Sequence, residues 1–145
     1  MTMTRRDAIR IAAGAAATFS TASAAQSPEK LKRLYDKAIV IDALSFGHVW
    51  DDIEHAAVRQ SGYTGIITSL DRSDLQTAID EIMVWKKRIK EMPDQYMMAL
   101  SASDFEHAKR ENKLAVMMNF QNATMLEGEV DNIDVLHAIG MRCFQ

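Results

Sequence analysis

The fold is decided by the short apolar run AIVI, Ala38–Ile41, and by the way its pattern returns along the chain. Three of its four residues are β-branched, and no polar residue alternates with them. Such runs are typical of strands that are buried on both faces, as in a parallel sheet. Comparable runs follow at Gly65–Thr68, Tyr96–Leu100, Leu114–Phe120 and Met141–Phe144. The sequence therefore predicts five strands.

Helical segments are predicted between these strands. Two of them begin with apparent capping boxes, Ser73-x-x-Gln76 and Ser103-x-x-Glu106. The predicted helices are Pro28–Asp36, Asp51–Gln60 with a stop near Gly62, Ser73 to just before Pro93, Ser103 to near Asn112, and Asp131–Ile139 with a stop at Gly140. Strands that alternate with helices over short connections predict an α/β fold with a parallel sheet.

Residues 1–24 are predicted to be a targeting segment. Arg5-Arg6 precedes a weakly apolar run that ends in Ala22-Ser23-Ala24, a small-x-small cleavage pattern. A twin arginine in this place is typical of a bacterial Tat signal peptide. We therefore expect recognition by the twin-arginine export machinery, cleavage by a signal peptidase, and a mature chain, 25–145, in the periplasm or outside the cell. The alternative is a basic N-terminus that runs into an Ala-rich helix.

Composition excludes several classes of protein. The net charge is −3, and the absence of a basic stripe argues against binding to nucleic acid. No segment after residue 24 approaches the roughly 18 apolar residues of a membrane span, so the mature chain is not expected to span a membrane. The single cysteine, Cys143, excludes a disulfide scaffold and a zinc site built on cysteine pairs. The length suits one domain.

Two stretches carry a family resemblance. The first is AIVIDA, Ala38–Ala43; the second runs from Ser101 to the end and includes NKLA at Asn112–Ala115, Phe120-Gln121 and DVLHAIGMR at Asp134–Arg142. This arrangement resembles the N-terminal part of the membrane (renal-type) dipeptidase family of zinc peptidases. The resemblance implies a partial (β/α)8 TIM-type barrel, amidohydrolase-like, and hydrolysis of dipeptides with zinc. A whole barrel needs about 250 residues, so we expect about the first half of one in 25–145.

The resemblance also says where zinc ligands should stand. The family's His-x-Asp pair falls at Leu44 and Phe46, and its zinc-bridging glutamate falls at Gln121. Leucine and phenylalanine have no lone pair to give a metal, and glutamine lacks the charge of a carboxylate. Zinc is thus implied by the resemblance but not supported by these residues, and the catalytic residues stay unknown.

Three residues are candidates for a polar site: Asp42, His48 and Gln121. Asp42 could orient a site residue or accept hydrogen bonds from N–H groups at a strand end. His48, with the aspartates at 51 and 52, could bind a metal or belong to a polar loop that starts a helix. Gln121-Asn122 could bind a polar ligand or cap its loop.

The other polar and aromatic residues are expected to have structural roles. Trp50 and Trp85 are expected to anchor packing, and His55 to be exposed or half-buried on its helix.

Three functions stay open. The chain could be a zinc-dependent dipeptidase, truncated and inactive as given. It could instead be a non-catalytic periplasmic descendant that binds a dipeptide or another small polar ligand near Asp42 and Gln121. Finally, it could be a small, complete α/β domain unrelated to peptidases.

Overall fold

The computed structural model of the chain describes residues 27–45, 50–70 and 73–145. Contacts divide the chain into two units, Met1–Leu34 and Tyr35–Gln145. The described part of the first unit is the start of helix α2 (Pro28–Lys37). The Ser27 hydroxyl accepts a hydrogen bond from the Lys30 N–H at 3.3 Å, as expected of a serine that begins a helix.

The predicted signal peptide lies outside the described residues. Its arginines, Arg5 and Arg6, and its cleavage site at Ala22 and Ala24 therefore remain predictions. Among the residues that are described, no helix combines the length and the apolar character needed to cross a bilayer.

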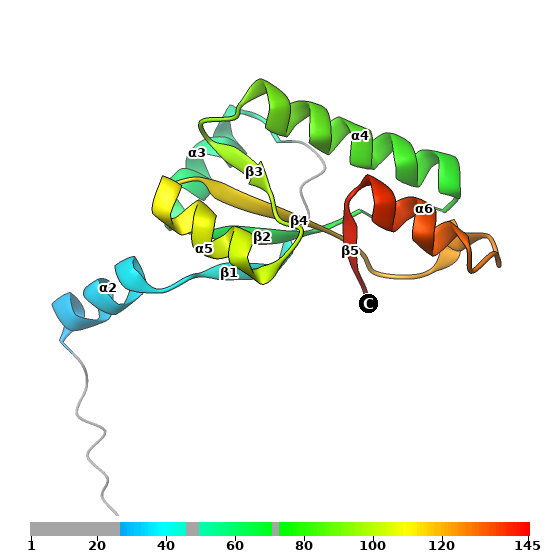
Figure 1. Ribbon diagram of the computed structural model, residues 1–145. Coiled ribbons are helices and arrows are strands. Elements are labelled where there is room, and N and C mark those ends of the chain that lie inside the picture. The colour runs from blue at the N-terminus through cyan, green and yellow to red at the C-terminus, as the bar shows by residue number, and fades with distance from the viewer. Residues whose placement is uncertain (1–26, 46–49, 71–72) are drawn as a thin grey trace, which may run out of the picture. The chain divides into compact units, whose positions relative to one another are not determined.

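The second unit is built on a parallel sheet (Figure 1). The described strands are β1 (Ile41–Ser45), β2 (Gly65–Ser69), β3 (Tyr96–Met98), β4 (Leu114–Phe120) and β5 (Met141–Phe144). Strand β2 pairs with one edge of β4, and the other edge of β4 is shared. Its first residues, 114–116, pair with β3, and its last residues, 118–120, pair with β5. The predicted α/β class with a parallel sheet is confirmed, while the shared edge is a feature that the strand pattern did not predict.

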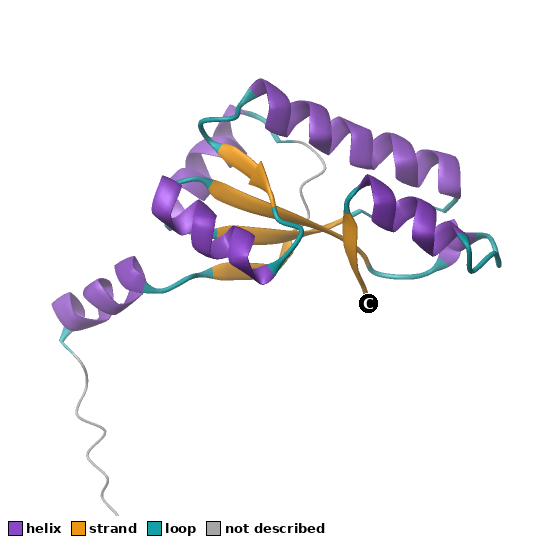
Figure 2. Cartoon of the chain, in the orientation of Figure 1, coloured by secondary structure: helices purple, strands orange, loops and turns teal. Residues whose placement is uncertain are grey.

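Helices cover both faces of this sheet (Figure 2). They are α3 (Asp52–Ser61), α4 (Leu75–Glu91), α5 (Ala102–Glu111) and α6 (Asn132–Ile139), with a 3-10 turn, η1 (Thr124–Leu126). Alternate residues of β4 face opposite ways. Val116, Met118 and Phe120 belong to the larger core with residues of α4 and α6. Ala115 instead packs with Phe105 and Ala108 of α5. We call these the α4 face and the α5 face of the sheet.

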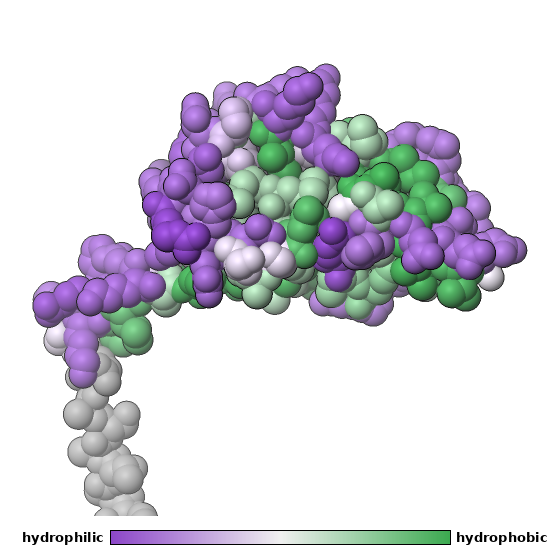
Figure 3. Space-filling model, in the orientation of Figure 1, coloured by the Kyte–Doolittle hydropathy of each residue, from purple (hydrophilic) through white to green (hydrophobic). Residues whose placement is uncertain are grey.

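The α4 face holds most of the buried apolar side chains. Ala78, Ile82 and Trp85 of α4 are fully buried there. Elsewhere, apolar side chains reach the surface over α6, as Figure 3 shows, with Val135 44% exposed.

Strand β1 begins three residues later than the sequence predicted. In place of Ala38–Ile41 it spans Ile41–Ser45. The residues before Ile41 are held by a different set of hydrogen bonds: the Val40 N–H donates to Thr64 Oγ1 at 3.1 Å, and the Val40 carbonyl accepts from the Thr64 and Gly65 N–H groups. Because these hydrogen bonds go to Thr64 and Gly65 at the start of β2, the regular pairing between β1 and β2 begins only after Val40.

The start of α4 also differs from the prediction. The N-cap is Asp74 rather than Ser73, and its carboxylate accepts from the Thr77 N–H at 2.9 Å. A charged acceptor makes a stronger hydrogen bond than a hydroxyl, so the helix begins one residue later than the capping-box pattern indicated.

Helix α5 starts earlier than predicted. The cap is Ser101 with Asp104, in place of Ser103 with Glu106. Asp104 Oδ2 accepts from the backbone N–H groups of Leu100 and Ser101, each at 2.8 Å. The Asp104 carboxylate therefore satisfies both backbone N–H groups at the start of this helix. Glu106 makes no hydrogen bond to either of them.

Candidate functional site

Three side chains form one row across the carboxyl ends of neighbouring strands. Ser69 of β2 pairs with Asn119 of β4, and Asn119 pairs in turn with Cys143 of β5. We call Ser69, Asn119 and Cys143 the strand-end row. In barrels built of parallel strands and helices, chemistry is carried by the carboxyl ends of the strands. The row therefore stands where a functional site of this fold belongs.

An extra residue in β5 sets the orientation of Cys143. The pairing steps from Met118–Met141 to Asn119–Cys143, so Arg142 is left over as a bulge. The Arg142 guanidinium donates to the carbonyls of Leu100 and His137 at 3.1 and 2.8 Å, which holds the bulge in place. As a result Cys143 shares the α5 face with Asn119.

The ring of Phe144 confirms this orientation. It stacks on Phe120 of the α4 face with ring centroids 6.1 Å apart, and adjacent strand residues face opposite ways. Cys143 therefore points away from the α4 face.

The row contains polar atoms whose hydrogen-bonding capacity is unused. Asn119 is fully buried and Ser69 is 1% exposed. Neither amide atom of Asn119 nor Ser69 Oγ has a hydrogen-bond partner among the described residues. Native proteins leave few such groups, since each costs about 1–3 kcal/mol when buried unpaired. Each such group requires an explanation, and a bound polar ligand is one that would satisfy these atoms.

Asp42 does not reach the strand-end row. It is the second residue of β1, pairs with Ile66, and lies level with Val116 of β4. Its carboxylate accepts from the Leu44 N–H at 3.1 Å within its own strand. The end of β4 at Phe120 is four residues further along, about 13 Å at 3.3 Å per residue. The structure therefore does not bring Asp42 together with Gln121, because β1 begins later than predicted.

Gln121 immediately follows β4 and is half-buried. Its side chain makes no hydrogen bond to the described residues, whereas Asn122 Oδ1 accepts from the Thr124 N–H at 3.0 Å. Asn122 thus caps the loop, which was one of the two alternatives for this pair, while the Gln121 side chain has no hydrogen-bond partner among the described residues. The remaining candidate, His48, and the predicted ligand position Phe46 lie outside the described residues.

Ser69, Asn119 and Cys143 are not among the three polar candidates that the sequence offered. Asn119 and Cys143 were each visible as a polar or thiol residue inside an apolar strand, but their alignment depends on the bulge at Arg142. A polar residue in the next-to-last place of the apolar run LAVMMNF was the signal that could have found Asn119.

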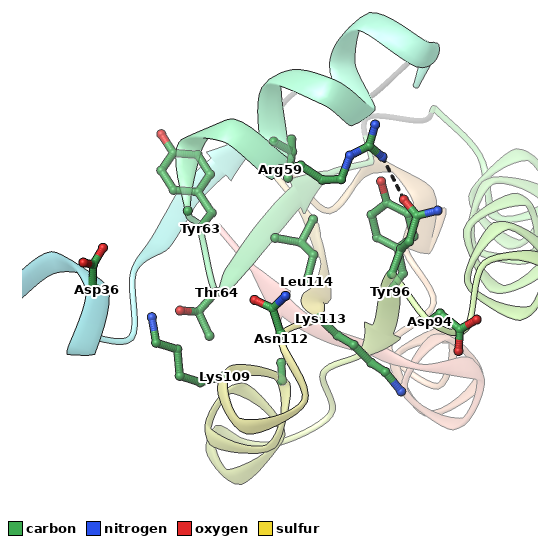
Figure 4. Close-up of a pocket in the computed structure, with 14 residues that line it drawn as sticks. Asp36, Arg59, Tyr63, Thr64, Asp94, Tyr96, Lys109, Asn112, Lys113 and Leu114 are labelled. Atoms are coloured by element: carbon green, nitrogen blue, oxygen red, sulfur yellow. Dashed lines mark hydrogen bonds between the residues drawn. The ribbon is translucent and has the colours of Figure 1, made fainter.

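A cavity of about 520 Å³ lies at the other end of the sheet, beside the first residues of β3 and β4 (Figure 4). Its cations include Arg59, which donates to Gln95 Oε1 at 2.8 Å, and Lys109. Both stand in the last turns of α3 and α5, where the helix dipole favours positive charge. The positions of Arg59 and Lys109 are therefore explained by the helix dipoles without a ligand. The cavity lies away from the strand-end row.

Four ring side chains pack together on the α4 face: Trp50, His55, Trp85 and Tyr96. The Trp50 ring lies 5.1 Å from Trp85 and 6.0 Å from Tyr96, which confirms that the tryptophans anchor packing. His55 is buried rather than exposed or half-buried as the sequence predicted. Its Nδ1 forms a hydrogen bond with the Tyr96 hydroxyl, and this partner makes its burial possible.

Comparison with known proteins places this geometry in a family. The model of the family Membrane dipeptidase (Peptidase family M19) matches residues 15–145. The chain belongs to this family. None of the curated proteins matches it. Family membership rules out the alternative of an α/β domain unrelated to peptidases.

Solved structures show the same fold. The chain is similar to an amidohydrolase from Pseudomonas aeruginosa, with 23% identity and a TM-score of 0.71 over 79% of this chain and 35% of that one. It is also similar to the probable dipeptidase PvdM from Pseudomonas aeruginosa, with 18% identity and a TM-score of 0.65 over 80% of this chain and 36% of that one. The dipeptidase AC, a metallopeptidase of family M19, matches with 11% identity and a TM-score of 0.61 over 72% and 41%.

These similarities establish the fold class. The sheet and its helices form a part of a (β/α)8 barrel of the amidohydrolase type, as the sequence predicted. The chain spans between 35% and 41% of the length of the three solved proteins.

The described residues do not fit a zinc site. Family M19 is in general zinc-dependent, and the resemblance places ligands at Leu44 and Gln121. Leu44 is an exposed apolar side chain, and Gln121 is a neutral amide. Within 27–45, 50–70 and 73–145, no three His, Cys, Asp or Glu side chains gather closely enough to hold a metal ion. The chemistry of the donors therefore disagrees with the metal that the family uses.

Proposed function

We propose that this chain binds a dipeptide, or a similarly small polar ligand, at the carboxyl ends of its strands, and that by itself it does not hydrolyse that ligand. The inherited activity of the family is that of a dipeptidase. The observation that carries the proposal is Gln121, a neutral amide at the position that the resemblance assigns to a zinc-bridging carboxylate.

Hydrolysis by a zinc peptidase depends on the metal, which lowers the pKa of a bound water and polarises the scissile carbonyl. Leu44 has no atom with which to bind a metal, and Gln121 binds a divalent cation far more weakly than glutamate does. Binding needs less. The strand-end row offers a hydroxyl and an amide that are unpaired among the described residues, and these groups can bond a polar ligand without a metal.

The test uses the purified 145-residue chain and the dipeptide L-alanyl-L-leucine, with and without added zinc chloride. We expect no release of leucine above the rate with zinc chloride alone, and saturable binding of labelled dipeptide in equilibrium dialysis. Turnover that a chelator abolishes would contradict the first expectation, and dialysis without saturable binding would contradict the second.

We also propose that residues 1–24 direct export through the twin-arginine pathway and are removed by a signal peptidase. The pattern that supports this is Arg5-Arg6 ahead of a weakly apolar run that ends in Ala22-Ser23-Ala24. Expression in a bacterium, followed by fractionation, should place the processed chain in the periplasm. An Arg5→Lys, Arg6→Lys variant should remain unprocessed in the cytoplasm, and equal export of both forms would refute the proposal.

A further inference from the structure

The strand-end row places one amide side chain between two strands of its own sheet. Asn119 is flanked by Ser69 on β2 and by Cys143 on β5, all on the α5 face of the sheet. Asn119 is fully buried, and both Oδ1 and Nδ2 lack a hydrogen-bond partner among the described residues. An apolar residue of similar size would avoid this cost, as Met117 does two residues earlier on the same face.

The two free atoms of Asn119 define what can pair with them. A carboxamide offers one acceptor and two donors, and its Oδ1 and Nδ2 lie side by side. Its best complement presents a donor and an acceptor on one edge. A residue in extended conformation does so, because its N–H and its C=O point to the same side, as in the paired residues of an antiparallel sheet.

The C-terminal residue of a dipeptide has this form. Its peptide N–H is the donor, and its carboxylate is a charged acceptor, which makes the stronger type of hydrogen bond. We propose that Asn119 recognises this unit: Oδ1 accepts from the peptide N–H, and Nδ2 donates to the terminal carboxylate. The inference rests on the proposed function, in which a dipeptide binds at the strand ends.

Neighbouring side chains allow this contact. Met117 and Cys143 are both half-buried on the same face, and methionine is unbranched and flexible. Because Asn119 is fully buried, the proposal requires Met117 to move aside and admit the ligand, which then lies against the Cys143 thiol. Ser69 Oγ is beside it as a further hydrogen-bonding group.

Cys143 supplies a local probe because it is the one cysteine of the chain. The experiment measures the rate at which Ellman's reagent modifies the thiol of the full chain, with and without L-alanyl-L-leucine. With ligand at ten times its Kd, only about a tenth of the molecules are free, so the rate should fall about tenfold. The ratio of the two rates within each variant corrects for any change in the intrinsic reactivity of the thiol.

Two changes test the role of Asn119. In Asn119→Leu, which keeps the number and branching of the side-chain heavy atoms, the dipeptide should no longer slow modification. The ester analogue of the dipeptide, with oxygen in place of the peptide N–H, should need about tenfold or more higher concentration to protect the wild-type thiol, because it leaves Oδ1 unpaired. The matched control is Thr68→Val, which removes another buried, unpaired hydroxyl from the opposite face and should leave protection unchanged.

The outcomes separate this inference from the proposed function. Dipeptide binding in dialysis, with protection that persists in Asn119→Leu or is equal for the ester, would overturn the role of Asn119 and leave the proposed function standing. The absence of both binding and protection in the wild-type chain would overturn both. Protection that is lost in Asn119→Leu and kept in Thr68→Val supports the assignment.

Discussion

Phe105 of α5 lies against Gly65, the first residue of β2, so closely that no other residue fits there. A Cβ on Gly65 would stand 2.3 and 2.5 Å from two ring atoms of Phe105, and 3.1 Å from the carbonyl oxygen of Ala115. Carbon atoms do not approach to these distances. Glycine at this position is therefore what allows α5 to dock on its face of the sheet.

Gly65→Ala should destabilise the fold by about 1–3 kcal/mol or more, since overpacking forces the ring of Phe105 or the backbone of β4 to move. Urea denaturation measures the change. A second substitution, Phe105→Leu, should recover part of the loss in the double variant by removing the ring atoms in conflict. Equal costs of Gly65→Ala with and without Phe105→Leu would show that the ring is not the cause.

Asn119→Leu should raise the free energy of unfolding by about 1–3 kcal/mol, because it replaces a buried amide that has no partner among the described residues with an apolar side chain of the same branching. Asn119→Asp should lower it by a similar amount or more, since a charge would then be buried unpaired. Both changes are measured by urea denaturation at neutral pH. A loss of stability in Asn119→Leu would mean that the amide has a partner that holds the fold together.

Sequence reasoning identified the classes of the elements because each rests on local pattern. The β-branched and apolar runs became strands, and Gly62 and Gly140 ended helices, both with positive φ. Caps were less predictable. Ser73 and Ser103 matched the pattern, but the nearby carboxylates of Asp74 and Asp104 are stronger acceptors and set where the helices begin.

Features that depend on contacts between distant segments were not predictable. The start of β1 is fixed by Thr64, whose side chain binds the Val40 N–H. The shared edge of β4 and the bulge at Arg142 arise only when β3 and β5 meet β4. Because the bulge decides which face Cys143 occupies, the strand-end row could not be deduced from the spacing of its residues.

The contribution of Asp104 to stability should depend on pH. Hydrogen bonds from the Leu100 N–H, and then from the Ser101 side chain, hold the pKa of the Asp104 carboxyl below its ordinary value of 3.8. Because the folded state lowers this pKa, the stabilisation is complete well above pH 3.8 and is lost as the pH falls through the lowered value.

Asp104→Asn should therefore cost about 1 kcal/mol at pH 7, as is typical for the loss of a helix cap, and less at pH 3. Urea denaturation of both proteins at the two pH values gives the difference. Glu106→Gln is the matched control on the same helix, because the exposed Glu106 side chain makes no hydrogen bond to the described residues. A cost of Asp104→Asn that is the same at both pH values would refute the explanation.

Tyr96→Phe should lower the free energy of unfolding by about 1–3 kcal/mol, because it leaves Nδ1 of the buried His55 without its hydrogen-bond partner. Burial raises the pKa of the Tyr96 hydroxyl above 10.0, against the opposing charges of Arg59 and Arg88. The folded state thus keeps its proton at a pH where the unfolded state loses it, and wild-type stability should fall above pH 10. Tyr96→Phe should show a smaller fall over the same range.

Tyr63→Phe is the control for this prediction. Tyr63 is half-buried and its hydroxyl makes no hydrogen bond to the described residues, so its removal should change the free energy of unfolding by less than about 0.5 kcal/mol. Denaturation at pH 8 and above pH 10 separates the two variants, and equal behaviour of Tyr96→Phe and Tyr63→Phe would show that the bond to His55 contributes nothing.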